Sequence, residues 1–307
     1  MVAGRAGVAQ ALATATGRPR AARFAVGEAE RGREAADQVP VNAAILFHLG
    51  LTAYAVSAAM YLAYLLKPAG VSARFGAWAM GVGFVFHGGA VAFRVMELAR
   101  DGTFRFAEGL SFLAFLTVGA ALLVNRFYRV PIIGAFVAPL VLAVLVPAHA
   151  IPGAEVPVSG SLVSVVLPLH IGVALAGVAL FALGFGVALM YLLLERELKA
   201  KKLGAMFRRL PSLQLLDSLN YRLVVLGFVA LSVTIVTGAL FSEMATGELV
   251  EFGAKQTFAL VAWGLIAAVV ALRQTIGWRG RRVAVATMAG FVLMTFAYAG
   301  IFVGGAV

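Results

Sequence analysis

Residues 163–194 read VSVVLPLHIGVALAGVALFALGFGVALMYLLL, a run that contains no lysine, arginine, aspartate or glutamate. A membrane-spanning helix needs about 20 predominantly apolar residues, so this run is long enough to cross a bilayer. A straight helix of this length would extend about 48 Å, which exceeds a hydrocarbon core of roughly 30 Å. We therefore expect this helix to be tilted or to project into water.

The rest of the 307-residue chain has the same apolar character. Hydrophobic residues make up 62% of the chain and charged residues 13%, and the mean hydropathy is +0.96. Soluble proteins are roughly 45–50% apolar and about 25% charged, so the composition excludes a water-soluble domain. We predict an all-α polytopic membrane protein. Its transmembrane helices, about eight in number, are expected at 41–66, 75–98, 108–125, 131–149, 163–194, 222–244, 256–273 and 283–305.

The first 40 residues differ from everything that follows them. They hold six arginines and four acidic residues, and they contain no long apolar run. The stretch 8–16 is too short and too polar for the apolar region of a secretory signal. We interpret residues 1–40 as a disordered N-terminal tail and residues 41–307 as one transmembrane domain.

Charge is distributed unevenly between the two sets of loops. The breaks after the first, third, fifth and seventh spans carry fifteen of the 25 lysines and arginines but only three of the 14 acidic residues. By the positive-inside rule these breaks face the cytoplasm, which places both termini on the outer side of the inner (cytoplasmic) membrane. The same rule accounts for the net charge of +11, so we expect membrane lipid and no nucleic acid as a partner.

Four histidines and the absence of cysteine limit the chemistry that the chain can perform. Without cysteine there is no disulfide, no thiolate metal site and no covalent haem attachment to this chain. His48, His149 and His170 fall toward the outer face, and His87 falls near the middle of the second span. A neutral imidazole can ligate haem iron. The alternative for each histidine is a packing role, with its ring bonded to a backbone carbonyl.

The other polar motifs favour structural roles. Arg94 closes the second span and Glu108 opens the third, so we expect a salt bridge between them. The three glutamates of 242–256 suggest a cation site, but loosely spaced acids on an outer loop are more often solvated. The sequence contains no phosphate-binding loop, zinc-protease motif, nucleophile elbow or dinucleotide fingerprint. We therefore expect a protein that is not an enzyme.

An ordered series of short motifs runs through the second half of the chain, and a weaker series through the first half. The chain resembles the CcsA/ResC-type cytochrome c assembly proteins and, within that superfamily, the HemX-like branch. The matching residues include Arg94, Glu108, Lys255, Trp263, Arg273 and Trp278. The stretches that carry the resemblance are LPLHIGV (167–173), MYLLLER (190–196), LPSLQLLDSLNYR (210–222), KQTFALVAW (255–263) and GWRG (277–280).

The resemblance implies a membrane protein that holds haem b non-covalently at its outer face for c-type cytochrome maturation. Family members use two external histidines beside a tryptophan-rich loop and pass haem to apocytochrome c. By position, His170 matches the first external histidine, and His149, His48 and His87 are the other candidate haem ligands. No metal other than haem iron is implied. The implied partners are apocytochrome c and a second assembly subunit.

The sequence departs from the family pattern at three places. Residues 246–256, which align with the tryptophan-rich motif, contain no tryptophan, and Ala271 replaces a transmembrane histidine. A second external histidine does not occur before Val307. HemX-type members also lack the full motif, and they are associated with tetrapyrrole synthesis. The alternative function is therefore a membrane regulator that affects glutamyl-tRNA reductase and binds a haem-biosynthesis enzyme through residues 195–222. A transporter is a third reading, but the sequence shows no convincing internal repeat.

Overall fold

Eight helices of alternating direction make up most of the described chain. The computed structural model describes residues 19–66, 70–101, 103–150, 155–157, 166–201, 210–246 and 253–303. A short antiparallel sheet pairs β1 (Thr103–Arg105) with β2 (Glu155–Pro157). The helices are α2 (Pro19–Leu66), α3 (Gly70–Asp101), α4 (Phe106–Tyr128), α5 (Ile133–Ala150), α6 (Val166–Lys199), α7 (Leu213–Thr246), α8 (Ala254–Ile276) and α9 (Arg281–Val303).

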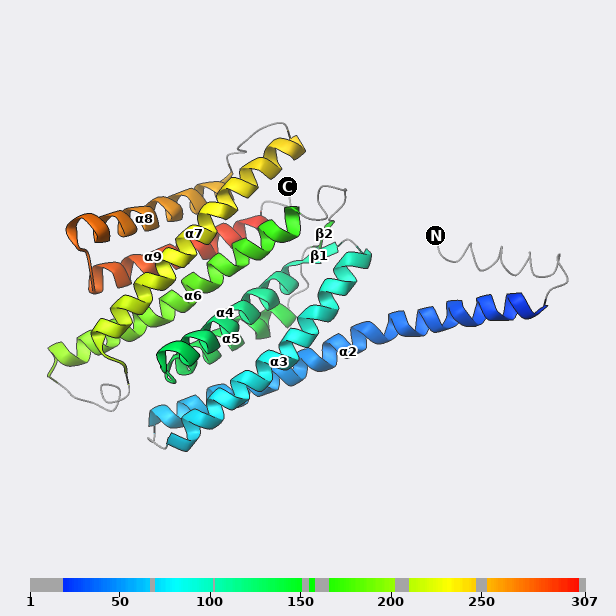
Figure 1. Ribbon diagram of the computed structural model, residues 1–307, viewed down its shortest axis with the longest axis horizontal. Coiled ribbons are helices and arrows are strands. Elements are labelled where there is room, and N and C mark those ends of the chain that lie inside the picture. The colour runs from blue at the N-terminus through cyan, green and yellow to red at the C-terminus, as the bar shows by residue number, and fades with distance from the viewer. Residues whose placement is uncertain are drawn as a thin grey trace.

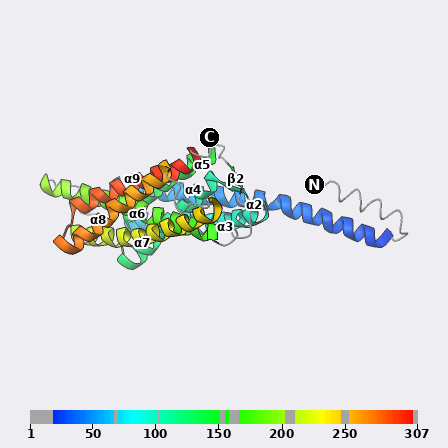
Figure 2. The same cartoon turned by 90° about the horizontal axis from the view of Figure 1, so that it is seen from above.

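The helices lie side by side, so the molecule has two ends (Figures 1 and 2). We call the end that carries β1 and β2 the strand end. We call the opposite end, where α4, α6 and α8 finish, the basic end, because residues such as Arg129, Lys199 and Arg281 gather there. α2 begins and α9 finishes at the strand end. The outer location of that end stays a prediction.

Six of the eight helices contain an apolar stretch long enough to cross a membrane, which confirms a polytopic all-α protein. The fourth predicted span, 131–149, is different, because the apolar part of α5 is only Ile133–Ala148. α9, which covers most of the eighth predicted span, is also not among the six. α5 continues through Pro139 and Pro147. The six stretches are Asn42–Leu66, Ser72–Leu98, Ala107–Tyr128, Leu169–Lys199, Leu213–Glu243 and Gln256–Ile276.

α2 includes the second half of the predicted N-terminal tail, because it begins at Pro19 and extends as one helix into the first span. The division into a disordered tail, residues 1–40, and a transmembrane domain stays a prediction. The first turns of α2 are rich in alanine, arginine and glutamate, all of which have high helix propensity. Figure 1 shows this part of α2 extending beyond the other helices. Residues 1–18 lie outside the described residues.

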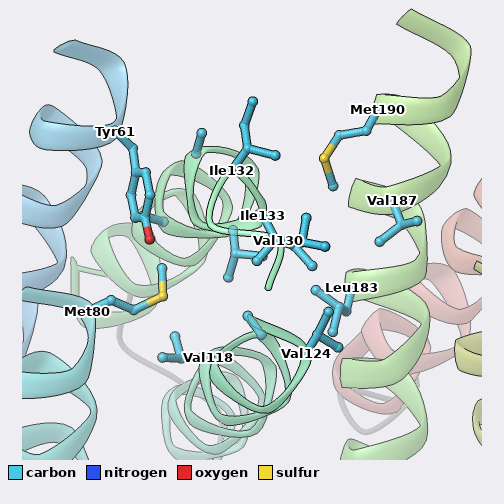
Figure 3. Packing of buried hydrophobic residues seen from close by; sticks show 14 of the residues in the cluster. Tyr61, Met80, Val118, Val124, Val130, Ile132, Ile133, Leu183, Val187 and Met190 are labelled. Carbon is cyan, nitrogen blue, oxygen red and sulfur yellow. The ribbon is translucent and has the colours of Figure 1, made fainter. Parts of the chain in front are cut away.

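α6 is the central helix of the molecule. It packs against α7 and α9 on one side and against α4 and α5 on the other. In α6, 61% of the most apolar window is buried, compared with 17–33% in the other five candidate spans. A large apolar core joins α2–α7 and includes Tyr61, Ile133 and Leu183 (Figure 3). A smaller core, which includes Phe181 and Ile266, joins α6–α9.

Two glycines let buried tyrosines pack directly against a neighbouring helix backbone. Tyr54 and Tyr61 of α2 are almost completely buried. A Cβ atom on Gly83 would lie 2.6 Å from Cδ1 of Tyr54, and one on Gly134 would lie 2.2 Å from Cε2 of Tyr61. These contacts leave no room for a side chain, so the close approach of α2 to α3 and α5 depends on glycine.

We predict that Gly83→Ala lowers the stability of the folded protein, because overpacking a tight core costs about 1–3 kcal/mol. Gly81→Ala on the same helix is the control, since a Cβ at that position meets no atom within 4 Å. Thermal unfolding in mild detergent should show a lower midpoint for Gly83→Ala alone. Equal midpoints for the two variants would contradict the packing described here.

Candidate functional site

The four histidines lie at different depths and in different surroundings. His48 of α2, His149 of α5 and His170 of α6 lie toward the strand end, whereas His87 lies deeper, between α2 and α4. The side chain of His149 lies outside the described residues. For His48, His87 and His170, the contacts of each ring nitrogen bear on iron ligation, which requires a nitrogen that carries a lone pair.

His170 is held by α7. Its Nδ1 lies 2.8 Å from Oγ1 of Thr237, and the Thr237 hydroxyl in turn donates to the carbonyl oxygen of Val233 at 2.8 Å. A hydroxyl has a single proton, so the contact of Thr237 with Val233 favours the tautomer in which Nδ1 of His170 carries the hydrogen and donates it. In that tautomer the lone pair of the ring is on Nε2.

Gly238 leaves the space that this ring occupies. A Cβ on Gly238 would lie 3.1 Å from Cε1 of His170. The Thr237-Gly238 pair thus performs two functions, because one residue orients the imidazole and the next leaves it room. The contact between Thr237 and His170 spans 67 positions of the sequence and was not predicted.

His48 shows the same nitrogen arrangement in a more exposed position. Its Nδ1 lies 2.7 Å from the carbonyl oxygen of Ala44, one turn earlier in α2. A carbonyl oxygen only accepts, so Nδ1 again carries the hydrogen in the neutral ring and Nε2 carries the lone pair. This bond to a backbone carbonyl is also the contact that the packing interpretation of the histidines predicts.

His87 is a buried polar residue with both ring nitrogens engaged. Nε2 lies 2.8 Å from Oγ of Ser111, and Nδ1 lies 3.3 Å from the hydroxyl of Tyr54. The rings of Phe47 and Phe115 pack edge-on against it. This environment satisfies the ring inside the apolar core, which is what a packing histidine needs. Its predicted role as a haem ligand stays a prediction.

A cavity of about 370 Å³ lies at the strand end between α2, α3, α4, α5 and α6. Its walls are apolar apart from Arg94, Arg105, Glu108 and Ser111. None of its lining residues, all of which belong to the described chain, is a histidine. Ile171 and Gly172 line the cavity while the neighbouring ring of His170 is bonded to α7. The ring of His170 therefore does not line the cavity, although the two residues that follow it do.

The predicted Arg94–Glu108 salt bridge is replaced by local contacts. Nη1 of Arg94 lies 2.5 Å from Oε2 of Glu97, three residues along the same helix. Glu108 accepts instead from the backbone N–H of Arg105 at 3.2 Å and so caps α4. A pair three residues apart forms inside one helix without any tertiary positioning, which explains why it is preferred.

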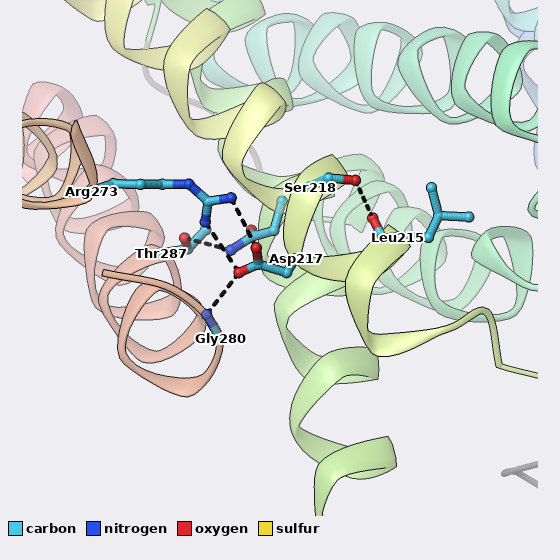
Figure 4. A network of polar contacts seen from close by, with 7 residues as sticks. Leu215, Asp217, Ser218, Arg273, Gly280 and Thr287 are labelled. Carbon is cyan, nitrogen blue, oxygen red and sulfur yellow. Dashed lines mark hydrogen bonds and ion pairs between the residues drawn. The ribbon is translucent and has the colours of Figure 1, made fainter. Parts of the chain in front are cut away.

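A second polar cluster holds the basic end together (Figure 4). The guanidinium of Arg273 donates to both carboxylate oxygens of Asp217, at 3.1 and 2.8 Å, and stacks over the ring of Tyr221. The backbone N–H of Gly280 donates to the same carboxylate at 2.7 Å. Asp217 therefore joins α7 to the α8–α9 turn, where Gly277 and Gly280 both have positive φ.

The remaining family-matched residues have structural contacts. Nε1 of Trp263 donates to Oγ of Ser232 at 2.9 Å, and the indole stacks on Phe228. The guanidinium of Arg282 lies over the ring of Trp278. The side chain of Lys255 lies outside the described residues, as does most of the loop 246–256. Within the described chain, no three histidine or acidic side chains gather as a metal-ion site.

Comparison with known proteins gives a consistent result. Residues 103–304 match the family described as "Cytochrome C assembly protein". The "Cytochrome c biogenesis protein CcsA" of Parasynechococcus marenigrum (strain WH8102) is 32% identical over 219 residues, which cover 63% of this chain and 72% of that protein. The protein of the same name from Mesostigma viride is 29% identical over 212 residues, which cover 62% and 64% of the two chains. The HemX-like branch stays a prediction.

We predict that Asp217→Ala destabilises the protein, because it leaves the mostly buried Arg273 guanidinium without its carboxylate. Breaking one side of a buried ion pair costs about 3–5 kcal/mol. The control is Glu195→Ala, which removes the partner of the exposed Lys199 and should cost at most about 1 kcal/mol. The thermal unfolding midpoints of the two variants in detergent test this prediction, and equal midpoints would refute it.

Proposed function

The chain belongs to the cytochrome c assembly protein family, and from that premise we propose that it binds haem b at the strand end during c-type cytochrome maturation. We propose further that the strand end faces outward from the cytoplasmic membrane. The gathering of lysine and arginine at the basic end supports this orientation through the positive-inside rule. The proposed partners are apocytochrome c and a second assembly subunit. The role is binding and transfer rather than catalysis of a reaction.

The single observation that carries the proposal is the orientation of His170. Metal-binding histidines commonly donate their second ring nitrogen to a protein group, which fixes the tautomer and the ring plane. The Thr237 contact does this for His170 and directs the lone pair to Nε2. Nε2 of His170 would hold the iron of haem b, because a neutral imidazole is a haem ligand. The donor set of the strand end therefore fits the group that the family implies.

The second histidine that would hold the haem iron is proposed to be His149 or His48. α5 packs directly on α6, whereas α2 packs on α3 and α5. By its position in the fold, the helix of His149 is thus the nearer neighbour of His170. His48 has the suitable tautomer, because Ala44 fixes its Nδ1.

The alternative function is a regulator of tetrapyrrole synthesis that needs no bound haem. Two features support it. The loop 246–256 contains no tryptophan, and Arg196, Lys199 and Lys201 are exposed at the basic end, where a cytoplasmic enzyme would have access to them. This function predicts capture of a haem-biosynthesis enzyme through residues 195–222, independent of His170.

We predict that the full-length protein, purified in mild detergent from haem-replete cells, shows a Soret band and sharp reduced α and β bands. His170→Ala should abolish these bands. Thr237→Val should weaken haem affinity by about 10–100-fold, as is typical when the hydrogen-bond partner of a metal ligand is removed.

Thr234→Val is the matched control, because Thr234 lies one turn earlier in α7 and bonds only its own helix, through the carbonyl of Ala230. It should leave the spectrum unchanged. A colourless wild-type protein that also fails to take up added haem would rule out haem binding and leave the regulatory function. Equal haem affinity in Thr237→Val and Thr234→Val would refute the positioning role of Thr237.

A further inference from the structure

The cavity between α2 and α6 lies at the depth where hydrocarbon meets lipid headgroups. Three of its lining residues, Ala43, Ala107 and Ala148, lie within one helical turn of the point where an apolar stretch ends at the strand end. These stretches are Asn42–Leu66, Ala107–Tyr128 and Ile133–Ala148. Its deeper wall is formed by side chains such as Phe47, Val91 and Leu145. A cavity with such walls does not hold ordered water well, because water needs several polar partners.

The polar groups of the cavity have both signs of charge. Arg94 and Arg105 provide two guanidinium groups, and Glu108 provides one carboxylate. Next to Arg94, Glu97 uses Oε2 in its ion pair, while its Oε1 is buried and finds no hydrogen-bond partner within the described chain. Buried polar atoms in proteins are rarely left unpaired. The site therefore offers donors for an anion and carboxylate acceptors for a cation.

We propose that this cavity binds a membrane phospholipid whose headgroup carries both a phosphate and a primary ammonium group. One acyl chain packs against the apolar walls of α2, α3 and α5. The phosphate accepts hydrogen bonds from Arg105 and Arg94, and the ammonium group donates to Glu108. Occupation by a chain also restores the dispersion contacts that an empty apolar space lacks.

Charge complementarity distinguishes this ligand from other membrane amphiphiles. A headgroup with negative charge alone satisfies the two arginines but repels Glu108. A choline headgroup carries a positive charge but has no N–H to donate to a carboxylate. Haem would need an imidazole nitrogen for its iron, and the lining residues contain none. None of the proposed haem ligands lines the cavity, although His149 directly follows the lining residue Ala148 and the carbonyl of the lining residue Ala44 orients His48.

The test measures lipid binding to the purified, delipidated full-length protein by native mass spectrometry. Phosphatidylethanolamine, phosphatidylcholine and phosphatidylglycerol with identical acyl chains are titrated separately. We expect the tightest binding for phosphatidylethanolamine. Glu108→Gln should weaken that binding by about tenfold or more, the effect of losing a charge-assisted hydrogen bond, and should weaken phosphatidylcholine binding less, because choline loses only the attraction between charges. Arg105→Gln should weaken all three lipids, since all carry the phosphate.

Lys199→Gln is the control for nonspecific charge effects, because Lys199 is an exposed cation at the basic end. Filling the cavity with Ala90→Leu should reduce binding of all three lipids. Ala44→Leu, at a half-buried lining position, serves the same purpose with less disturbance of the core. The unfolding midpoint of each variant is measured alongside, so that loss of folding is distinguished from loss of binding.

Three results would overturn the proposal. The first is equal or tighter binding of phosphatidylglycerol, and the second is unchanged lipid binding in both filled variants. The third is loss of the haem spectrum, rather than of lipid, in Ala90→Leu and Ala44→Leu, which would make the cavity a haem pocket. The haem function and the lipid site can fail separately, because His170→Ala should leave phosphatidylethanolamine binding intact.

Discussion

The absence of hydrogen-bond partners in hydrocarbon is the constraint on which the whole architecture depends. In that environment the backbone must bond to itself, which allows helices and excludes open strands. The described chain follows this rule, because its one small sheet lies at the strand end and not between the apolar parts of the helices. Side-chain hydroxyls obey it as well, since Thr117, Ser232 and Thr295 each donate to a carbonyl four residues earlier.

The same constraint explains why the polar side chains inside the bundle occur as partnered sets. His87 has Tyr54 and Ser111, and Asn220 donates to Thr287 across α7 and α9. Each set joins two or more helices at a fixed register, so it specifies how the helices pack in a membrane where apolar contacts alone discriminate poorly. Burial of a polar side chain in this bundle therefore does not by itself indicate a functional role.

Helix positions were more predictable than helix contacts. The runs of apolar residues identify all eight helices of the described chain, because the length of an apolar run is a local property of the sequence. The contacts of His170 with Thr237 and of Arg273 with Asp217 join residues 67 and 56 positions apart. The site residues were predicted from how deep each one lies along its span. That depth does not indicate which neighbouring helix a side chain faces. For example, Arg94 and Glu108 were predicted to pair because they lie at a similar depth. Arg94 pairs instead with Glu97, because residues three apart lie on the same face of a helix.

α6 gives the molecule two functional surfaces. His170 is oriented toward α7, and Ile171 and Gly172, which follow it directly, line the cavity formed with α2–α5. Successive residues on a helix differ in direction by about 100°, so one turn can serve two sites without sharing a side chain. The larger apolar core joins α6 to α2–α5 and also includes Leu216 and Leu219 of α7, whereas the smaller core joins α6 to α7, α8 and α9. The lipid on one side can therefore stabilise the position of α6, on which the alignment of His170 with Thr237 depends, without contacting the histidine.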